Sequence, residues 1–319
     1  LIALYFFELS FDQFITILVI GYFIRLLLMI LLANHYYQVR IRLHFPSNIR
    51  SIFIYSATIL LAAFAGSLII DIDKFMIPQL QEIQQTAFYA IAIFAATLVE
   101  VPARAMQQIL NPLVSTAVNE NNAKEVNNLY KKSALNLVVV SGWFFLLVNL
   151  NSEALFSLLP DVGYQTATTV VLYISLAKLL TMIFGCGSAI IANSSFYQIT
   201  LVFSIFMALG VTLLNVMWIP LYGIDGAALA TLVMISVSLL IKVAYLYYKI
   251  NAHPLSWNMC KTLIVVGILF VVFESFDFTV SPVLQIVLTS ALVSVVYFVI
   301  AVQLKLSNDL LGLLHRVIK

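Results

Sequence analysis

Long apolar runs separated by short polar connections follow one another along almost the whole chain. Nine of them approach the length that a membrane-spanning helix needs, about 20 residues. The runs lack the alternation of barrel strands, and lipid offers no partners to an irregular backbone. The pattern predicts an all-α polytopic membrane protein with nine complete transmembrane helices. They cover residues 12–33, 51–70, 86–107, 133–150, 166–184, 199–218, 226–248, 262–276 and 282–302.

An apolar stub precedes the first complete run. It extends from Leu1 to Phe7, with no initiator Met and no basic segment before it. A signal peptide would need such a basic segment. We therefore expect the chain to begin inside a larger gene, as an N-terminally truncated fragment.

The composition agrees with the membrane assignment. The 319 residues are 63% hydrophobic and 9% charged, with a mean hydropathy of +1.05. A soluble domain has about 45–50% apolar and about 25% charged residues. The 11 Gly, 8 Pro and 2 Cys also exclude collagen, disorder and a disulfide scaffold.

Basic residues in the connections predict the orientation. Counted alternately, one set of connections holds eleven Lys and Arg residues, whereas the other holds only Lys74. Because cytoplasmic connections are rich in Lys and Arg, this places the C-terminus in the cytoplasm. The tail from Lys305 to Lys319 reads either as an amphipathic helix on the inner surface or as a solubilising end. On the first reading, one helical face carries Leu306, Leu310, Leu313, Leu314 and Val317.

Glu100 and Arg104 lie four residues apart inside a predicted span that also contains Pro102. This spacing puts them on one helical face, where they can neutralise each other. Pro102 removes a backbone hydrogen bond and predicts a bend. Two interpretations stay open: an ion pair that satisfies itself near the inner helix end, or two groups that face a hydrated cavity.

Two further basic residues lie within spans without an acidic neighbour on the same helix. Lys178 is at mid-span, so snorkelling to a surface is incomplete and a cavity-facing position is favoured. Arg25 has a similar position, with snorkelling as the equal alternative. Both are candidate substrate-binding cations.

Asp71, Asp73 and Lys74 cluster at the outward end of the second complete span. Two carboxylates at this spacing could bind a proton or cation, with Lys74 tempering their repulsion. An interfacial cluster that ends the helix is the equal alternative. Asp71-Ile72-Asp73 also matches a weak Asp-x-Asp metal pattern of some membrane glycosyltransferases.

The sequence contains no Gly-rich phosphate loop, HExxH motif, Cys/His cluster or nucleophile elbow. We therefore expect no cofactor, no resident metal, no enzymatic activity and no nucleic-acid partner.

The most distinctive stretch runs from Ile219 to Thr231. Pro220 and Gly223 stop one helix and turn the chain, Asp225 can cap the next helix, and Gly226 begins a small-xxx-small face. This predicts a tight outer hairpin. The stretch resembles the "IPxYGIxGAAxAT" signature of O-antigen type polysaccharide flippases of the multidrug, oligosaccharidyl-lipid and polysaccharide exporter superfamily. Residues 73–77 and 86–92 loosely resemble the same family, and the resemblance covers about Ile49 to Tyr248.

The resemblance implies a fold of two six-helix lobes around a central cavity, as in MATE-like transporters that work by alternating access. On that map, residues 1–46 are the end of the N-terminal lobe and residues 47–250 are the six-helix C-terminal lobe. Residues 251–319 supply two additional helices and the cytoplasmic tail. Drug and cation antiporters of the superfamily usually lack these two helices.

The same resemblance implies a flippase for a polyprenyl-pyrophosphate-linked oligosaccharide in the bacterial inner membrane. Such a protein would serve lipopolysaccharide or related polysaccharide biosynthesis, with membrane lipids and other polysaccharide-assembly proteins as partners. From charge and depth we expect Arg104, Lys178 and Arg25 to face the diphosphate. Asp71, Asp73 and Glu100 are the candidates for ion coupling.

Three alternatives remain at this point. A cation-coupled multidrug antiporter would favour acidic and aromatic cavity residues, whereas the intramembrane excess here is basic. A flippase for the peptidoglycan precursor would differ mainly in substrate. A membrane glycosyltransferase or polymerase would need sizeable outer loops, and the outward connections are short.

Overall fold

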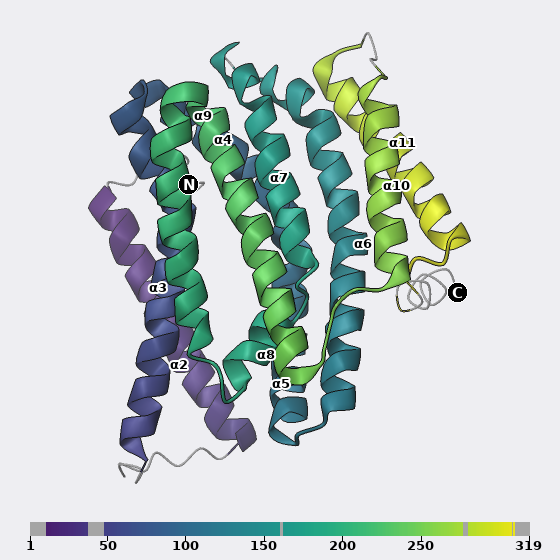
Figure 1. Cartoon of the computed structure of the whole chain (residues 1–319). Coiled ribbons are helices and arrows are strands. Elements are labelled where there is room, and N and C mark those ends of the chain that lie inside the picture. Colours follow the sequence, from purple (N-terminus) through teal and green to yellow (C-terminus); the bar gives the residue numbers. More distant parts are fainter. Residues whose placement is uncertain (1–10, 38–47, 160–161, 277–279, 308, 310–319) are drawn as a thin grey trace. The chain divides into compact units, whose positions relative to one another are not determined.

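The computed structural model describes residues 11–37, 48–159, 162–276, 280–307 and 309. For residues 11, 65–71 and 162 it describes the backbone but not the side chains. All regular elements within these ranges are helices (Figure 1). In chain order they are α2 (Phe11–Tyr37), α3 (Ile49–Leu80), α4 (Ile83–Ala96), the 3-10 helix η1 (Thr97–Glu100), α5 (Val101–Asn119), α6 (Ala123–Phe156), the 3-10 helix η2 (Val162–Ala167), α7 (Thr168–Met182), α8 (Gly187–Asn193), α9 (Ile199–Ile250), α10 (Trp257–Glu274) and α11 (Pro282–Gln303).

The prediction of an all-α polytopic membrane protein is confirmed. Each of the nine apolar runs falls on these helices to within two residues, and the run 86–107 extends over α4, η1 and the start of α5. By length and composition alone, the described residues contain six helices able to cross a membrane, or seven if a bent pair counts as one. Two features make this count lower than nine. The helix α9 is counted once although it contains two helices, and α3 contributes only its short apolar part, Ile49–Phe64.

The chain divides into two compact units. Leu1–Phe53 contains α2 and the start of α3, and Ile54–Lys319 contains the rest of α3 and all later helices. In the first unit, the segment Asp12–Tyr36 is long and apolar enough to span a membrane, and none of its residues is buried. The packing and the candidate site described below all belong to the second unit.

Local sequence signals set several helix ends in the second unit. The Asn122 side chain accepts a hydrogen bond from the Glu125 backbone N–H at 3.1 Å and thereby caps α6. Ser256 caps α10 in the same way through the Met259 N–H. Pro282 is the first residue of α11, a position where its missing N–H costs nothing.

The predicted hairpin between Ile219 and Thr231 is confirmed within α9. Gly223 has a φ of 60° and a ψ of −138°, a conformation that L side chains rarely adopt, and it separates two helical arms (Figure 1). A Cβ atom on Gly226 would lie 2.3 Å from the Trp218 carbonyl oxygen. The arms approach this closely only because position 226 has no side chain.

Residues of the hairpin belong to a large hydrophobic cluster of the second unit. Ile219, Ile224, Ala227 and Ala228 are buried against residues of α4, α6 and α7. The Gln81 side-chain amide, after the end of α3, donates a hydrogen bond to the Ile219 carbonyl at 3.0 Å. The predicted cap by Asp225 is not seen: its Oδ1 is buried without a hydrogen-bond partner among the described residues.

The helices α10 and α11 pack on α6. Tyr297 is buried and donates a hydrogen bond to the Val139 carbonyl at 2.6 Å, and the Trp143 indole donates one to Ser294 at 2.9 Å. A shared apolar cluster includes Phe145, Val266 and Val293. The last two helices therefore form an extension of the α6 face, which Figure 1 shows beside α6.

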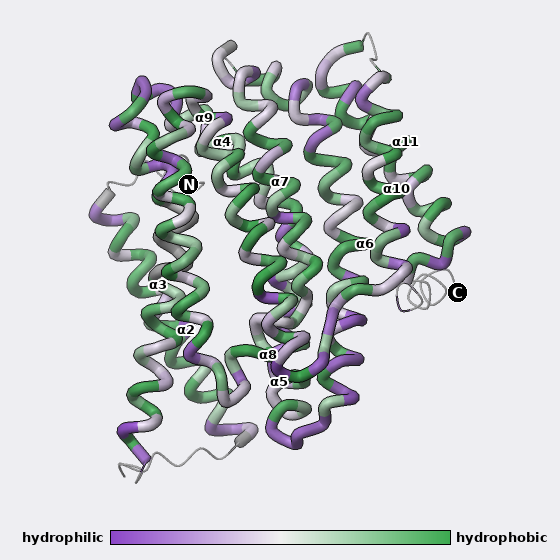
Figure 2. Tube along the Cα trace, in the orientation of Figure 1, coloured by the Kyte–Doolittle hydropathy of each residue, from purple (hydrophilic) through white to green (hydrophobic). Residues whose placement is uncertain are grey.

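The basic connections of the second unit meet at one end of the bundle. The Asn127 side chain, near the start of α6, accepts a hydrogen bond from the His253 N–H, after the end of α9. Asn258, at the start of α10, donates to the Lys305 carbonyl beyond α11 at 3.5 Å. Figure 2 shows polar residues gathered where the helices end. This end carries Lys124, Lys131, Lys132, Lys249, Lys261 and Lys305.

Most of the predicted amphipathic tail lies outside the described residues, including Leu310, Leu313, Leu314 and Val317. Leu306 is described and is fully buried. Its backbone N–H bonds to the Ala301 carbonyl at 3.0 Å, which folds the start of the tail back against the end of α11.

Candidate functional site

The first helix of the site is interrupted where the sequence predicts a bend. The α-helical pattern of α4 ends at Ala96, residues 97–100 form the 3-10 helix η1, and α5 starts with Pro102 in its first turn. The four residues before α5 thus have 3-10 geometry, and the bend expected from Pro102 stays a prediction. Glu100 is the last residue of η1 and lies at this interruption.

A second helix is interrupted after α7. The segment Gly163–Met182 and α8 are bent by 55° at the break between them. Gly185 lies in this break with a φ of +47°, and a Cβ atom there would come within 2.7 Å of the Ala134 backbone nitrogen. The Ser133 hydroxyl accepts a hydrogen bond from the Cys186 N–H at 3.0 Å. The break is thus held tightly against α6.

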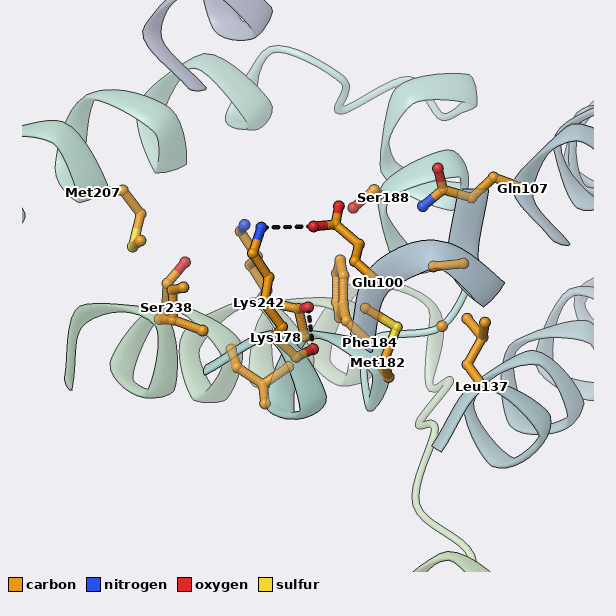
Figure 3. Close-up of a pocket in the computed structure, with 15 residues that line it drawn as sticks. Glu100, Gln107, Leu137, Lys178, Met182, Phe184, Ser188, Met207, Ser238 and Lys242 are labelled. Atoms are coloured by element: carbon orange, nitrogen blue, oxygen red, sulfur yellow. Dashed lines mark hydrogen bonds and ion pairs between the residues drawn. The ribbon is translucent and has the colours of Figure 1, made fainter. Parts of the chain in front are cut away.

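A pocket of about 240 Å³ opens between these interruptions and α9 (Figure 3). Irregular backbone at membrane depth is typical of sites that line a water-filled cavity. The polar lining comes from both broken helices and from the second arm of α9. It consists of Glu100, Gln107, Lys178, Thr181, Ser188, Ser238 and Lys242.

Three charged side chains face this pocket. Lys178 Nζ lies 2.6 Å from Glu100 Oε2, and the two side chains are 19% and 30% exposed. Lys242 Nζ lies 5.8 Å from the Phe203 ring centroid and 5.9 Å from that of Phe184, within cation–π range. Lys242 has no acidic partner within 4.0 Å among the described residues. The pocket therefore carries two ammonium groups and one carboxylate.

Of the two interpretations left open for Glu100 and Arg104, the self-satisfied ion pair is not seen. Within the described part of the chain, Glu100 pairs with Lys178 from α7, 78 positions away in sequence, and faces the pocket. Arg104 is exposed on α5.

The three predicted substrate-binding cations have different surroundings. Lys178 lines the pocket, and Arg104 is exposed on α5 and does not line it. Arg25 is exposed on α2, which belongs to the first unit.

Asp73 is buried in a separate polar cluster. Its carboxylate accepts hydrogen bonds from the Tyr89 hydroxyl at 2.6 Å, the Thr231 hydroxyl at 3.0 Å and the Asn215 amide at 2.5 Å. These donors belong to α4 and to both arms of α9, so one carboxylate joins three helical segments to α3. Asp71 is also on α3, but its side chain lies outside the described residues.

Sequence reasoning did not select Lys242 or Ser238. Lys242 lies within the predicted span 226–248, where a charged residue already marks a candidate site. The sequence alone does not show that α7 and the second arm of α9 line the same pocket. Ser238 is 3% exposed, and its hydroxyl has no hydrogen-bond partner among the described residues.

Residues 14–159 match the model of a family described as polysaccharide biosynthesis protein. The matched segment is a little under half of the chain and includes η1, Glu100 and the Asp73 carboxylate. The hairpin in α9 and Lys178 lie outside it. No curated protein matches the chain.

The match and the fold together support a multi-pass membrane protein with a role in polysaccharide biosynthesis. Within the described residues, the pocket that holds Lys178, Lys242 and Glu100 is the candidate site of such a protein.

Proposed function

We propose that the chain is part of a flippase that moves a polyprenyl-pyrophosphate-linked oligosaccharide across a bacterial inner membrane by alternating access. The observation that carries this proposal is the pocket beside η1 and the break after α7, which holds Lys178 and Lys242 against a single carboxylate. The family match supplies the biosynthetic context.

The pocket suits the diphosphate better than the whole substrate. Its volume is about 240 Å³, whereas pockets that enclose drug-sized ligands measure about 300–1,000 Å³. Ammonium groups removed from bulk water attract phosphate oxygens strongly. In this proposal the two lysines hold the diphosphate, the sugars occupy the larger cavity of a complete two-lobed protein, and the lipid tail stays in the bilayer.

The basic end of the bundle supports the proposed orientation. Lys and Arg residues are concentrated in cytoplasmic connections of inner-membrane proteins. With the end that carries Lys124, Lys249 and Lys305 in the cytoplasm, the α9 hairpin is at the outer side. The C-terminus is then cytoplasmic, and polysaccharide-assembly proteins are the expected partners.

Glu100 and Asp73 differ in their access to water, which bears on ion coupling. Of the predicted carboxylates, Asp73 already accepts three hydrogen bonds in the core, whereas Glu100 is 30% exposed in the pocket. A coupling carboxylate must exchange protons or cations with water. Glu100 meets this condition better, and Asp73 is the second candidate.

Substitution of the pocket lysines tests the proposed function. In the full-length gene product, Lys178→Ala or Lys242→Ala should each lower transport of the lipid-linked oligosaccharide at least about tenfold, as expected when a charge-assisted hydrogen bond worth about 1.5–3 kcal/mol is lost. Transport is measured as the appearance of labelled sugar on the far side of proteoliposomes.

The matched control is Lys249→Ala, which removes a lysine from the same arm of α9 outside the pocket. This variant should transport at the unsubstituted rate. Arg104→Ala should have a smaller effect than Lys178→Ala, because Arg104 does not line the pocket. Normal transport by a folded Lys178→Ala/Lys242→Ala protein would remove the pocket from the mechanism.

A further inference from the structure

The pocket already contains an anion of its own. Glu100 Oε2 accepts a charge-assisted hydrogen bond from Lys178 at 2.6 Å. Glu100 reaches Lys178 from the interruption between η1 and α5, and Lys178 comes from α7. A diphosphate that enters the pocket must therefore compete with Glu100 for the same ammonium group.

We propose that Glu100 is an internal competitor of the anionic substrate, and that its protonation frees Lys178 to bind the diphosphate. The inference rests on the proposed function and adds the link between substrate binding and proton uptake. In the empty pocket, the Glu100 carboxylate neutralises Lys178. In the loaded pocket, the diphosphate contacts Lys178 and Lys242, and Glu100 carries a proton taken from water.

Electrostatics within the pocket give the direction of this exchange. A carboxylate that loses its ammonium partner and faces a multiply charged anion is repelled by it, which favours the neutral acid. The proton comes from solvent and binds a Glu100 carboxylate oxygen, so the step needs no further reactant. Release of the substrate reverses the step and returns the proton to water.

The described charged groups that line the pocket with Glu100 are few. Lys178 belongs to α7 and Lys242 to the second arm of α9, and both are basic. The pocket-lining residues of α5 and α6 are Ala103, Gln107 and Leu137, which are uncharged, and α4 contributes none. Arg104 is one turn further along α5 and is exposed. Glu100 is thus the one acidic group among the described residues that line this pocket.

Binding of inorganic pyrophosphate to the purified full chain in detergent tests the inference. Glu100→Gln should bind pyrophosphate about tenfold more tightly than the unsubstituted chain, because it keeps the side-chain shape but no longer competes as an anion. Glu100→Asp keeps the charge and should resemble the unsubstituted chain. Glu153→Gln, which removes an exposed carboxylate outside the pocket, is the matched control and should change nothing.

Proton uptake on pyrophosphate binding is a second measurement. If Glu100 had only a structural role, its substitution would not change this uptake. Calorimetry in two buffers of different ionisation enthalpy should show more protons taken up per pyrophosphate by the unsubstituted chain than by Glu100→Gln.

The possible outcomes separate the inference from the proposed function. If pyrophosphate binding depends on Lys178 and Lys242 but Glu100→Gln binds no more tightly, the inference is wrong and the proposed function stands. Equal proton uptake by the two chains would also show that the inference is wrong. Pyrophosphate binding that is absent, or unchanged in Lys178→Ala/Lys242→Ala, contradicts both.

Discussion

Replacing Gly226 with alanine should destabilise the chain by about 3 kcal/mol, at the upper end of the usual cost of overpacking. The added Cβ atom would lie 2.3 Å from the Trp218 carbonyl oxygen and 2.7 Å from its carbon. Both are backbone atoms, so no side-chain rotation can relieve the contact. The arms of the α9 hairpin must move apart, and Ala227 and Ala228 must leave their places in the core.

The measurement is the unfolding midpoint of the purified protein in detergent. Gly267→Ala is the matched control, because a Cβ atom there would have no neighbour within 4 Å and Gly267 is also in a transmembrane helix, α10. Alanine favours helix over glycine, so this variant should be neutral or slightly more stable. Equal stability of the two alanine variants would show that the hairpin is looser than described.

Replacing Asp73 with alanine should cost about 2–5 kcal/mol of stability. The substitution leaves three donors without their acceptor: the Tyr89 hydroxyl, the Asn215 amide and the Thr231 hydroxyl. An orphaned buried donor costs about 1–3 kcal/mol, although interhelical hydrogen bonds in membranes average nearer about 0.6 kcal/mol. The lost contacts would loosen α3 and α4 from both arms of α9.

Unfolding midpoints of a graded series test this cluster. Tyr89→Phe removes one donor and keeps the carboxylate bonded to Asn215 and Thr231, so its loss should be about 1 kcal/mol. Glu82→Ala removes an exposed carboxylate between α3 and α4 and should be neutral. A change below about 0.5 kcal/mol for Asp73→Ala would mean that the three hydrogen bonds contribute nothing to stability.

The sequence was sufficient for the features that depend on local chemistry. Apolar runs predicted the helices, because every backbone group in lipid needs an intrahelical partner. Pro220, Gly223 and Gly226 predicted the hairpin, since helix termination and close approach depend on residue type at fixed positions.

The site was only partly predictable because its key contacts are tertiary. Lys178 was expected to face a cavity on the basis of depth alone. Its partner Glu100 is 78 positions away, and the sequence instead offered Arg104, four residues from Glu100. The pairing depends on the packing of α7 beside η1, a tertiary contact that charge spacing does not encode. Lys242 was overlooked for the same reason.

Transport by proteoliposomes that contain the full-length gene product tests the proposed flippase most directly. The vesicles would be offered a polyprenyl-pyrophosphate-linked oligosaccharide and, separately, an organic cation typical of multidrug antiporters. The account predicts movement of the lipid-linked oligosaccharide, lost in Lys178→Ala/Lys242→Ala and kept in Lys249→Ala. Export of the organic cation with no movement of the lipid-linked sugar would contradict it.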